Sequence, residues 1–316
     1  MENNRLMIVV PCYNEQDVLN QSDERLRQLL SIMIDEGFVA QDSRILYVND
    51  GSTDGTWNII EQLTQQHPCV CGLKLAANVG HQNALMAGLE EAARLADIIV
   101  SIDADLQDDI NVIPEMVANW RQGNDIVYGV RNRRDSDSWF KRNTALAFYR
   151  LMQRLGVRSV YNHADFRLMS RRAVEQLCRY RERNLFLRGV VPLVGYRSAT
   201  VYYDRVARTA GESKYPLSKM INFAADGITS FSIKPVRMVL ALGLIFILVA
   251  LTMLVYVLVA YFGGHTVSGW ASLMLSIWFV GGFILLGLGI VGEYIGKIYI
   301  EVKDRPRYNV EEKIIK

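Results

Sequence analysis

The chain has 316 residues, half of them hydrophobic, and a formal net charge of only +2 at pH 7. This length allows one large domain or two smaller ones. A nearly neutral charge balance gives no reason to expect nucleic acid as a partner. The four cysteines form no Cys-X-X-Cys pair, so neither a zinc site nor a disulfide framework is indicated.

Residues 1 to about 160 alternate short apolar runs with amphipathic stretches, which is typical of strands and helices in βαβ units. This alternation predicts an α/β fold with a largely parallel sheet. Strands are expected at Leu6–Val10, Ile45–Val48, Leu73–Leu75, Ile98–Ile102 and Ile126–Tyr128, and helices at Glu15–Glu36, Thr56–Gln66 and Gln82–Leu95.

Polar and charged residues follow each of the five expected strands. In open α/β sheets, ligands bind beyond the carboxyl ends of the strands, so we expect these side chains to share one site. Turn chemistry alone would explain the glycines and asparagines, but it explains less well why so many charges gather there. The charged residues, in chain order, are Glu15, Asp50, Asp103, Asp105 and Arg131.

Asp103 and Asp105 are the most informative pair, because they directly follow the fourth expected strand. Two neighbouring carboxylates are costly to bring together unless a cation neutralises them. Hard divalent ions such as Mg²⁺ accept carboxylate oxygens and usually bridge to phosphate. The pair therefore predicts a metal–phosphate site, with a solvated acidic loop as the alternative.

Three common phosphate-binding patterns fit the chain poorly. The segment Pro11–Glu15 stands where a dinucleotide-binding fold would have G-x-G-x-x-G, and the P-loop pattern G-x-x-x-x-G-K-[ST] is absent. A phosphatase with an aspartate nucleophile would have Thr or Val where this chain has Gln107, which weakens that interpretation without excluding it.

Two segments near the C-terminal end predict membrane spans. Met238–Phe262 and Trp270–Val291 are almost wholly apolar, and each exceeds the roughly 20 residues that cross a bilayer core. Lysines and arginines flank the pair but are absent from its link, so the positive-inside rule predicts a hairpin with both ends in the cytoplasm. Two buried core helices are the alternative. No signal peptide is seen before the first strand, so the N-terminal domain is expected in the cytosol.

A further apolar pattern at helical spacing lies between Pro216 and Pro235, which predicts a helix at the membrane interface or, alternatively, a core helix. The basic residues just before it, Arg205, Arg208 and Lys214, could attract a lipid phosphate.

Several motifs resemble known enzymes. Pro11–Glu15, Asn49–Gly55 and Asp103–Asp108 resemble the family 2 glycosyltransferases of the GT-A fold. Later motifs are similar to the polyprenyl-phosphate glycosyltransferases, which include bactoprenol glucosyltransferases and dolichol-phosphate mannose synthase. Those motifs are Ala164–Arg171, Glu182–Phe186 and Arg208–Tyr215, together with the hairpin and the tail segments Gly292–Gly296 and Arg305–Tyr308.

This resemblance, which covers nearly the whole chain, implies an activity. The expected reaction is inverting transfer of a hexose from a nucleotide-diphosphate sugar to undecaprenyl phosphate, giving a lipid-linked sugar for cell-envelope glycan modification. UDP-glucose is the favoured donor, with UDP-N-acetylglucosamine or a modified sugar as alternatives. A divalent metal, Mg²⁺ or Mn²⁺, is the implied cofactor. The implied partners are the donor, the lipid acceptor, membrane lipids and further copies of the chain, with a tetramer suggested by related proteins.

The resemblance also assigns residues to roles. It implies Asp165 as the proposed base, with Asp105 as a second catalytic residue. It implies a metal site at Asp103, Asp105 and Gln107. The nucleotide-sugar site would comprise Pro11, Tyr13, Glu15, Asp50, Asp103, Gln107 and Arg131, and the lipid phosphate would contact Arg208, Ser213 and Lys214. A phosphate monoester is already mostly ionised at neutral pH, so we expect Asp165 to orient the acceptor more than to act as a strong base.

The implied organisation has four parts. A cytosolic GT-A catalytic domain spans 1–214 and an interfacial amphipathic segment 215–235. Two transmembrane helices, at about 238–262 and 270–293, occupy 236–296, and a basic cytosolic tail spans 297–316.

Two residues depart from the family pattern: Ala77 stands where relatives often have Arg, and Asp109 where many have Pro. Two other functions were weighed. A processive polysaccharide synthase would carry a Q-x-x-R-W motif and more spans, and a non-catalytic scaffold would not need the intact acidic residues. His81 and His163 flank the expected site and are interpreted as structural histidines.

Overall fold

The computed structural model describes residues 4–131, 163–183, 186–204, isolated positions between 236 and 262, and 269–315. These residues fall into two compact units. One unit contains an α/β sheet and the chain from Arg305 onward, and the other contains the long helix α10 (Trp270–Val302) with the described positions between 236 and 262.

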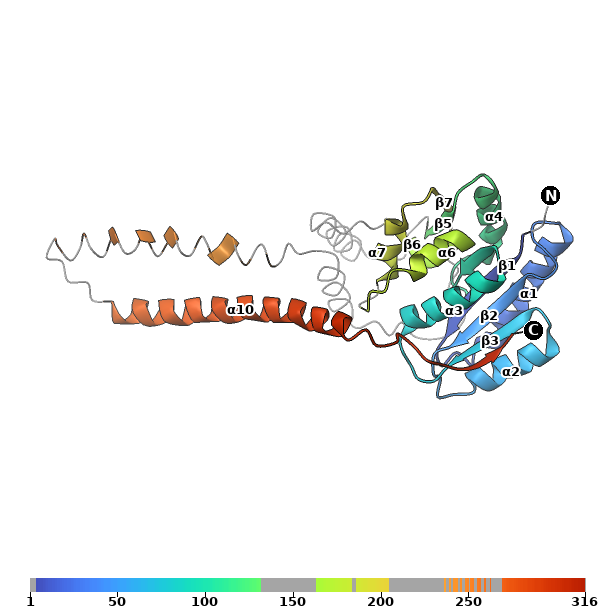
Figure 1. The fold of residues 1–316 in the computed structure, drawn as a ribbon, viewed down its shortest axis with the longest axis horizontal. Helices are drawn as coiled ribbons and strands as arrows, with labels where there is room; N and C mark the ends of the chain where they lie inside the picture. The colour runs from blue at the N-terminus through green and yellow to red at the C-terminus, as the bar shows by residue number, and fades with distance from the viewer. Residues whose placement is uncertain are drawn as a thin grey trace. The chain divides into compact units, whose positions relative to one another are not determined.

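The first unit is built on one mixed sheet of eight strands, in the order β7-β5-β6-β4-β1-β2-β3-β8 (Figure 1). Strands β1 to β5 all run in the same direction, whereas β6 is antiparallel to β4 and β5, and β8 is antiparallel to β3. The strands are β1 Leu6–Cys12, β2 Arg44–Asn49, β3 Val70–Leu75, β4 Ile98–Ser101, β5 Ile126–Arg131, β6 His163–Ser170, β7 Ser198–Tyr203 and β8 Val310–Ile314. The predicted α/β fold is confirmed, and the five predicted strands are parallel to one another.

Helices cover both faces of this sheet. Alternate residues of β1 point to opposite faces. Leu6, Ile8 and Val10 belong to a buried cluster with α1, α2 and α4. On the other face α3 lies close to β1, because a Cβ on Gly88 would come within 2.4 Å of Val9. The helices are α1 Leu19–Asp35, α2 Thr56–Gln66, α3 His81–Leu95, α4 Ile113–Arg121, α6 Arg171–Cys178 and α7 Leu187–Val190, with short 3₁₀ turns η1 Ile110–Val112 and η2 Val191–Val194.

The helix predicted from Glu15 begins later, at Leu19. The carbonyl of Glu15 accepts hydrogen bonds from the amides of Val18 and Leu19, so the chain makes a turn before the helix. This turn belongs to the loop after β1 and leaves Glu15 at the edge of the sheet.

The tail after α10 returns to the sheet of the first unit. Its strand β8 pairs with β3, and the Asn309 carbonyl accepts the Ala76 amide. Tyr308 donates to Glu90 on α3, and the Lys313 ammonium lies 2.6 Å from a Glu91 oxygen. The edge of β3 is therefore covered by the chain's own tail, and an exposed edge is otherwise prone to pair with other chains.

Helix α10 is the single described helix that is long and apolar enough to cross a membrane, over Phe279–Val302 with a mean hydropathy of 1.8. Many of its large apolar side chains are exposed, such as Leu285 and Leu288. It continues to Val302, past the predicted end at 293. Much of the first predicted span, 238–262, and the whole interfacial segment 215–235 lie outside the described residues. The two-helix hairpin therefore stays a prediction.

Candidate active site

The carboxyl ends of β1 to β5 lie along one edge of the sheet, as parallel strands require. The loops beyond them are joined by hydrogen bonds that link residues far apart in sequence. The structure thus brings the predicted strand-end residues to one edge, and the described members of the set are Pro11, Tyr13, Glu15, Asp50, Asp103, Asp105, Gln107, Arg131 and Asp165.

The loop after β1 is fixed by the loop after β2. Asn14 has a left-handed backbone (φ 56°), which asparagine tolerates better than most residues. Its amide donates to the Ser52 hydroxyl at 3.0 Å, and its side-chain oxygen accepts from the Thr53 amide at 2.9 Å. The Glu15 amide donates to the Thr56 hydroxyl at 2.9 Å. These bonds fix the backbone between Tyr13, which is exposed, and Glu15, which is partly buried.

Asp50 ties the loop after β2 to the loop after β3. Its buried carboxylate accepts the amides of Val79 at 2.7 Å and Gly80 at 3.0 Å. Burial raises the pKa of Asp50, and these two hydrogen bonds oppose the rise. The loops approach so closely that a Cβ on Gly51, whose φ is +61°, would lie 2.5 Å from the Asn78 nitrogen. Asp50 therefore shapes the edge of the site, whatever it contacts in a complex.

The loop after β4 carries the acidic pair. The Ser22 hydroxyl donates to the Ala104 carbonyl at 2.6 Å, which anchors the loop to α1. Leu106 is buried and has a positive φ of 43°, so the chain turns sharply between Asp105 and Gln107. The Gln107 side-chain amide then donates to the Asp105 carboxylate. The turn places two acidic side chains and one amide within a few residues of each other.

Asp103 stands among other acids. The pKa of Asp103 is raised from 3.8 to about 6: burial is the largest cause, His81 opposes the rise, and the charges of Asp165, Asp108 and Asp105 add to it. The Asp103 side chain is still 43% exposed, so water moderates this crowding. A carboxylate that is hard to ionise in this setting would gain from a bound cation.

The donor groups present fit a divalent metal. Asp103, Asp105 and Gln107 offer carboxylate and amide oxygens, the ligands that Mg²⁺ and Mn²⁺ prefer. In the part of the chain that the structure describes, no three His, Cys, Asp or Glu side chains are grouped closely enough to hold an ion by themselves. In general, Mg²⁺ is held by one or two protein carboxylates together with substrate phosphates and water.

Arg131 is held by a second acid from the same loop. Its Nη2 lies 2.8 Å from Asp108, whose carboxylate is buried, and its Nε donates to the Tyr203 hydroxyl at 3.3 Å. Tyr203 in turn donates to Asp108 at 2.7 Å. Burial would lower the pKa of Arg131, but Asp108 and Tyr203 raise it well above its usual value. The guanidinium is therefore a fixed positive charge, with its side chain 27% exposed.

Asp165 lies on β6, between β4 and β5 in the sheet. It forms ion pairs with Arg167 at 2.6 Å and with Arg188 at 3.1 Å. Burial raises the pKa of Asp165, but the charges of Arg188, Arg167 and His81 outweigh burial and hold it well below its usual value. Asp165 is thus a firmly ionised carboxylate and a weak base.

His81 connects the two acidic regions. Its Nε2 lies 3.5 Å from an Asp103 oxygen and 4.0 Å from an Asp165 oxygen. The side chain is 44% exposed, so it faces the site more than the core. His81, which was expected to flank the site as a structural histidine, thus lies between the predicted metal ligand and the predicted base.

Three partners of the predicted site residues were not expected from the sequence: Arg167, Arg188 and Tyr203. Arg167 could have been found, because residues two apart on a strand share a face and Asp165 was already singled out. Arg188 and Tyr203 carry no local signal, since they meet their partners only through the fold. The predicted lipid-phosphate residues Arg208, Ser213 and Lys214 lie outside the described residues.

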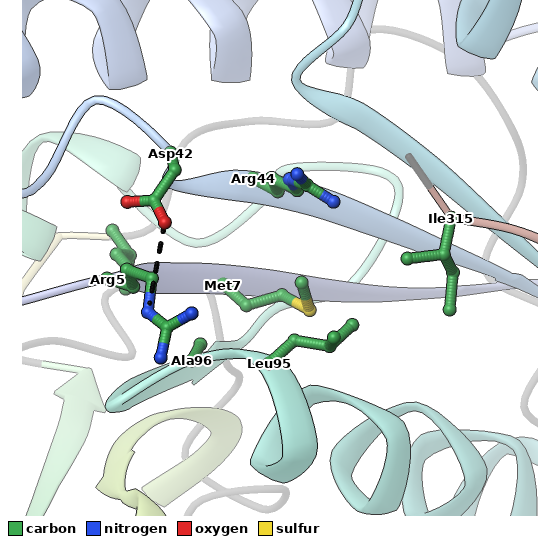
Figure 2. Close-up of a pocket in the computed structure, with 8 residues that line it drawn as sticks. Arg5, Met7, Asp42, Arg44, Leu95, Ala96 and Ile315 are labelled. Atoms are coloured by element: carbon green, nitrogen blue, oxygen red, sulfur yellow. Dashed lines mark ion pairs between the residues drawn. The ribbon is translucent and has the colours of Figure 1, made fainter.

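A cavity of about 180 Å³ lies at the opposite edge of the sheet, at the amino ends of β1 and β2 (Figure 2). Figure 2 shows Arg5 paired with Asp42 there, with Met7 and Ile315 nearby. None of the predicted site residues lines this cavity. It is therefore distinct from the strand-end site.

The fold and the strand-end site together define an α/β protein with a site rich in carboxylates and arginines. The profile described as glycosyl transferase family 2 matches residues 7–178, which is more than half of the chain. The chain belongs to this family and is a glycosyltransferase.

Two relatives match nearly the whole chain. The glycosyltransferase YkoT of Bacillus subtilis (strain 168) is 52% identical over 306 residues, covering 97% of this chain and 91% of that protein. The SfII prophage-derived bactoprenol glucosyl transferase of Shigella flexneri is 39% identical over 313 residues, covering 98% of each. Among solved structures, glucosyl-3-phosphoglycerate synthase from Mycobacterium tuberculosis, in complex with Mn²⁺, UDP and phosphoglyceric acid, is 19% identical. The match covers 72% of this chain and 76% of that one, with a TM-score of 0.46.

Proposed function

We propose that this glycosyltransferase moves a hexose from a nucleotide-diphosphate sugar, UDP-glucose first, to undecaprenyl phosphate on the cytosolic face of a membrane. The main support is the match to a bactoprenol glucosyl transferase over 98% of both chains. The strand-end site adds chemical support, because it combines groups suited to a diphosphate with groups suited to an acceptor phosphate.

The donor half of the proposed reaction needs negative charge to be neutralised. When the sugar leaves the nucleoside diphosphate, charge builds on the departing phosphate. Arg131 is held in place by Asp108 and Tyr203 and would donate to that phosphate. Asp103, Asp105 and Gln107 would hold the divalent ion. When bound, such an ion supplies Lewis-acid stabilisation of the leaving group.

On the acceptor side, positioning the phosphate matters more than removing a proton from it. The second pKa of a phosphate monoester is about 6, so its oxygen is already mostly ionised at neutral pH. Asp165, whose pKa is held low, is a poor proton acceptor. We therefore propose that Asp165 organises the acceptor side, and that attack by the phosphate inverts the anomeric carbon.

The membrane part of the proposal joins the described helix to the sequence. Helix α10 exposes a long apolar surface, which in water would be unfavourable and in a bilayer is expected. With the apolar stretch 238–262 it would form a hairpin, with both chain ends and the GT-A catalytic domain in the cytosol. The segment 215–235 would lie at the interface and the tail 297–316 in the cytosol. Assembly as a homo-oligomer, such as a tetramer, belongs to the same proposal.

A donor panel tests this function. Purified full-length protein would be incubated with radiolabelled UDP-glucose, UDP-N-acetylglucosamine or GDP-mannose, undecaprenyl phosphate, and Mg²⁺, Mn²⁺ or EDTA. The expected result is a single-sugar lipid product from UDP-glucose that EDTA abolishes. Long polymer would indicate a processive synthase instead, and the absence of lipid product with every donor and metal would contradict the proposal. The Asp105→Asn variant is the matched inactive control.

A further inference from the structure

Two arginines from different elements bind the same carboxylate of Asp165. Arg167 lies two residues along β6, and its Nη2 is 2.6 Å from Asp165 Oδ1. Arg188 lies on α7, and its Nη2 is 3.1 Å from Asp165 Oδ2. Asp165 thus holds two guanidinium groups from different elements at one point, and a guanidinium is a suitable group for binding a phosphate.

The two arginines differ in their access to solvent. The Arg167 side chain is 1% exposed, and its Nε and Nη1 have no hydrogen-bond partner among the residues that the structure describes. Buried donors without partners are costly, so an arginine kept in this position points to a use for its charge. The Arg188 side chain is 35% exposed and can be reached by a ligand.

The cluster also lies beside the proposed donor site. His81 Nε2 is within 4.0 Å of both an Asp165 oxygen and an Asp103 oxygen. One imidazole thus separates the carboxylate that holds Arg188 from the carboxylate assigned to the metal. A transfer reaction needs its acceptor close to the diphosphate, and the Arg188 side of Asp165 meets that requirement.

We propose that Arg188 binds the phosphate of the acceptor, and that Asp165 and Arg167 are positioning residues that hold its guanidinium at the site. This inference rests on the proposed function. A guanidinium matches a phosphate group with two parallel hydrogen bonds, and a phosphate monoester carries about −1.5 to −2 charge at neutral pH. Asp165 orients the guanidinium group of Arg188. The buried positive charge of Arg167 favours the ionised form of Asp165, which is the form that binds Arg188.

The test compares acceptor and donor kinetics in full-length protein. Farnesyl phosphate is the acceptor, because a short chain reduces effects of membrane partitioning, and farnesol is the control without phosphate. In Arg188→Gln we expect the KM for farnesyl phosphate to rise about 10- to 100-fold, as for loss of a charge-assisted hydrogen bond. The donor KM and the slow hydrolysis of the donor by water should stay unchanged. Arg94→Gln, which alters an exposed ion pair on α3, is the matched control and should change neither KM.

Several outcomes separate this inference from the proposed function. If the wild type transfers no sugar to any prenyl phosphate, the proposed function itself fails. If the wild type is active but Arg188→Gln keeps the wild-type acceptor KM, or raises both KM values equally, the inference is overturned. Inorganic phosphate should compete with farnesyl phosphate in the wild type and compete less in Arg188→Gln, which separates binding of the phosphate group from binding of the lipid. If Arg188→Gln does not fold, Arg188→Lys keeps the charge but loses the fork, and an unchanged acceptor KM in that variant would equally overturn the inference.

Discussion

The two halves of the strand-end site are held together in different ways. The half formed by the loops after β1, β2 and β3 is joined by hydrogen bonds to backbone amides and hydroxyl groups, as between Asp50 and the amides of Val79 and Gly80. The half formed around β4, β5 and β6 is joined by ion pairs, as between Asp165 and Arg188. The first kind of contact fixes the shape of a loop, and the second also sets the charge of the site. We expect the first half to resist changes of salt, and the second half to respond to them.

The largest expected effect is on the acidic pair. Asp105→Asn removes a charged oxygen from the proposed metal site, and we expect transfer to fall by about 10²- to 10³-fold, the usual cost of removing one group that stabilises transition-state charge. Initial rates at saturating donor and metal would measure it. Asp109→Asn on the same loop is the control, because asparagine caps the following 3₁₀ turn as well as aspartate does. Equal rates in the two variants would remove Asp105 from the mechanism.

The second effect concerns the buried ion pair. Arg167→Met leaves the Asp165 carboxylate with one arginine fewer, and breaking a buried pair costs about 3 kcal/mol. The pKa of Asp165 is depressed in the folded protein, so its stabilising contribution is present above its unfolded pKa and is lost as pH falls through the folded pKa. In Arg167→Met the folded pKa of Asp165 should lie closer to its unfolded pKa, so less stability should be lost between neutral and acidic pH. Thermal unfolding between neutral and acidic pH would show it, and a parallel downward shift at every pH would contradict the electrostatic explanation.

The third effect belongs to the half that is held by hydrogen bonds to backbone amides and hydroxyl groups. Asp50→Asn keeps the size of the side chain but turns one acceptor into a donor that faces a backbone amide. We expect a loss of about 1–3 kcal/mol, the cost of an unsatisfied buried donor. The loss should be the same at low and high salt, unlike that of Arg167→Met. If the loss of stability in Asp50→Asn depended strongly on salt, the two halves of the site would not differ as proposed.

The smallest expected effect is a dependence of folding stability on pH. The pKa of Asp103 is raised to about 6 from 3.8, so metal-free folded protein should become less stable as pH rises from about 4 to about 6. The exposure of the side chain keeps this slope shallow. Unfolding midpoints measured in EDTA should show it in the wild type and not in Asp103→Asn, and added Mn²⁺ should offset it. An identical slope in wild type and Asp103→Asn would mean that other carboxylates cause it.

The sequence predicts one side of the sheet better than the other. Strands β1 to β5 were found because each is a short apolar run, and their shared direction followed from the βαβ pattern. Strand β6 was missed because it carries Asp165 and Arg167, and a hydrophobic pattern cannot reveal charges that neutralise each other inside a sheet. Strand β8 was missed because it reads Val310-Glu311-Glu312-Lys313-Ile314, a mostly exposed edge strand with little apolar signal.

The candidate site shows the same limit. Each acid at a strand end could be named from its position after an apolar run. Its partner could not, because Asp165 meets Arg188 across 23 positions of chain, and Arg131 meets Tyr203 across 72. Pairings of this kind depend on which strands become neighbours, and β6 enters the sheet between β4 and β5 against the direction of both. Sequence motifs therefore identify the candidate site residues. Whether such a side chain is held ionised depends on its partners, which are known only from the fold.

The tail strand β8 has a consequence for how the protein is made. Because β8 follows α10 in the chain, the ribosome completes the apolar helix before the strand that covers β3 exists. Until then β3 has an open edge, which is a site for pairing with other chains. In the proposed membrane topology, insertion of α10 can begin before β8 closes the edge of the sheet. A chain that ends before β8 would keep this edge of β3 unpaired.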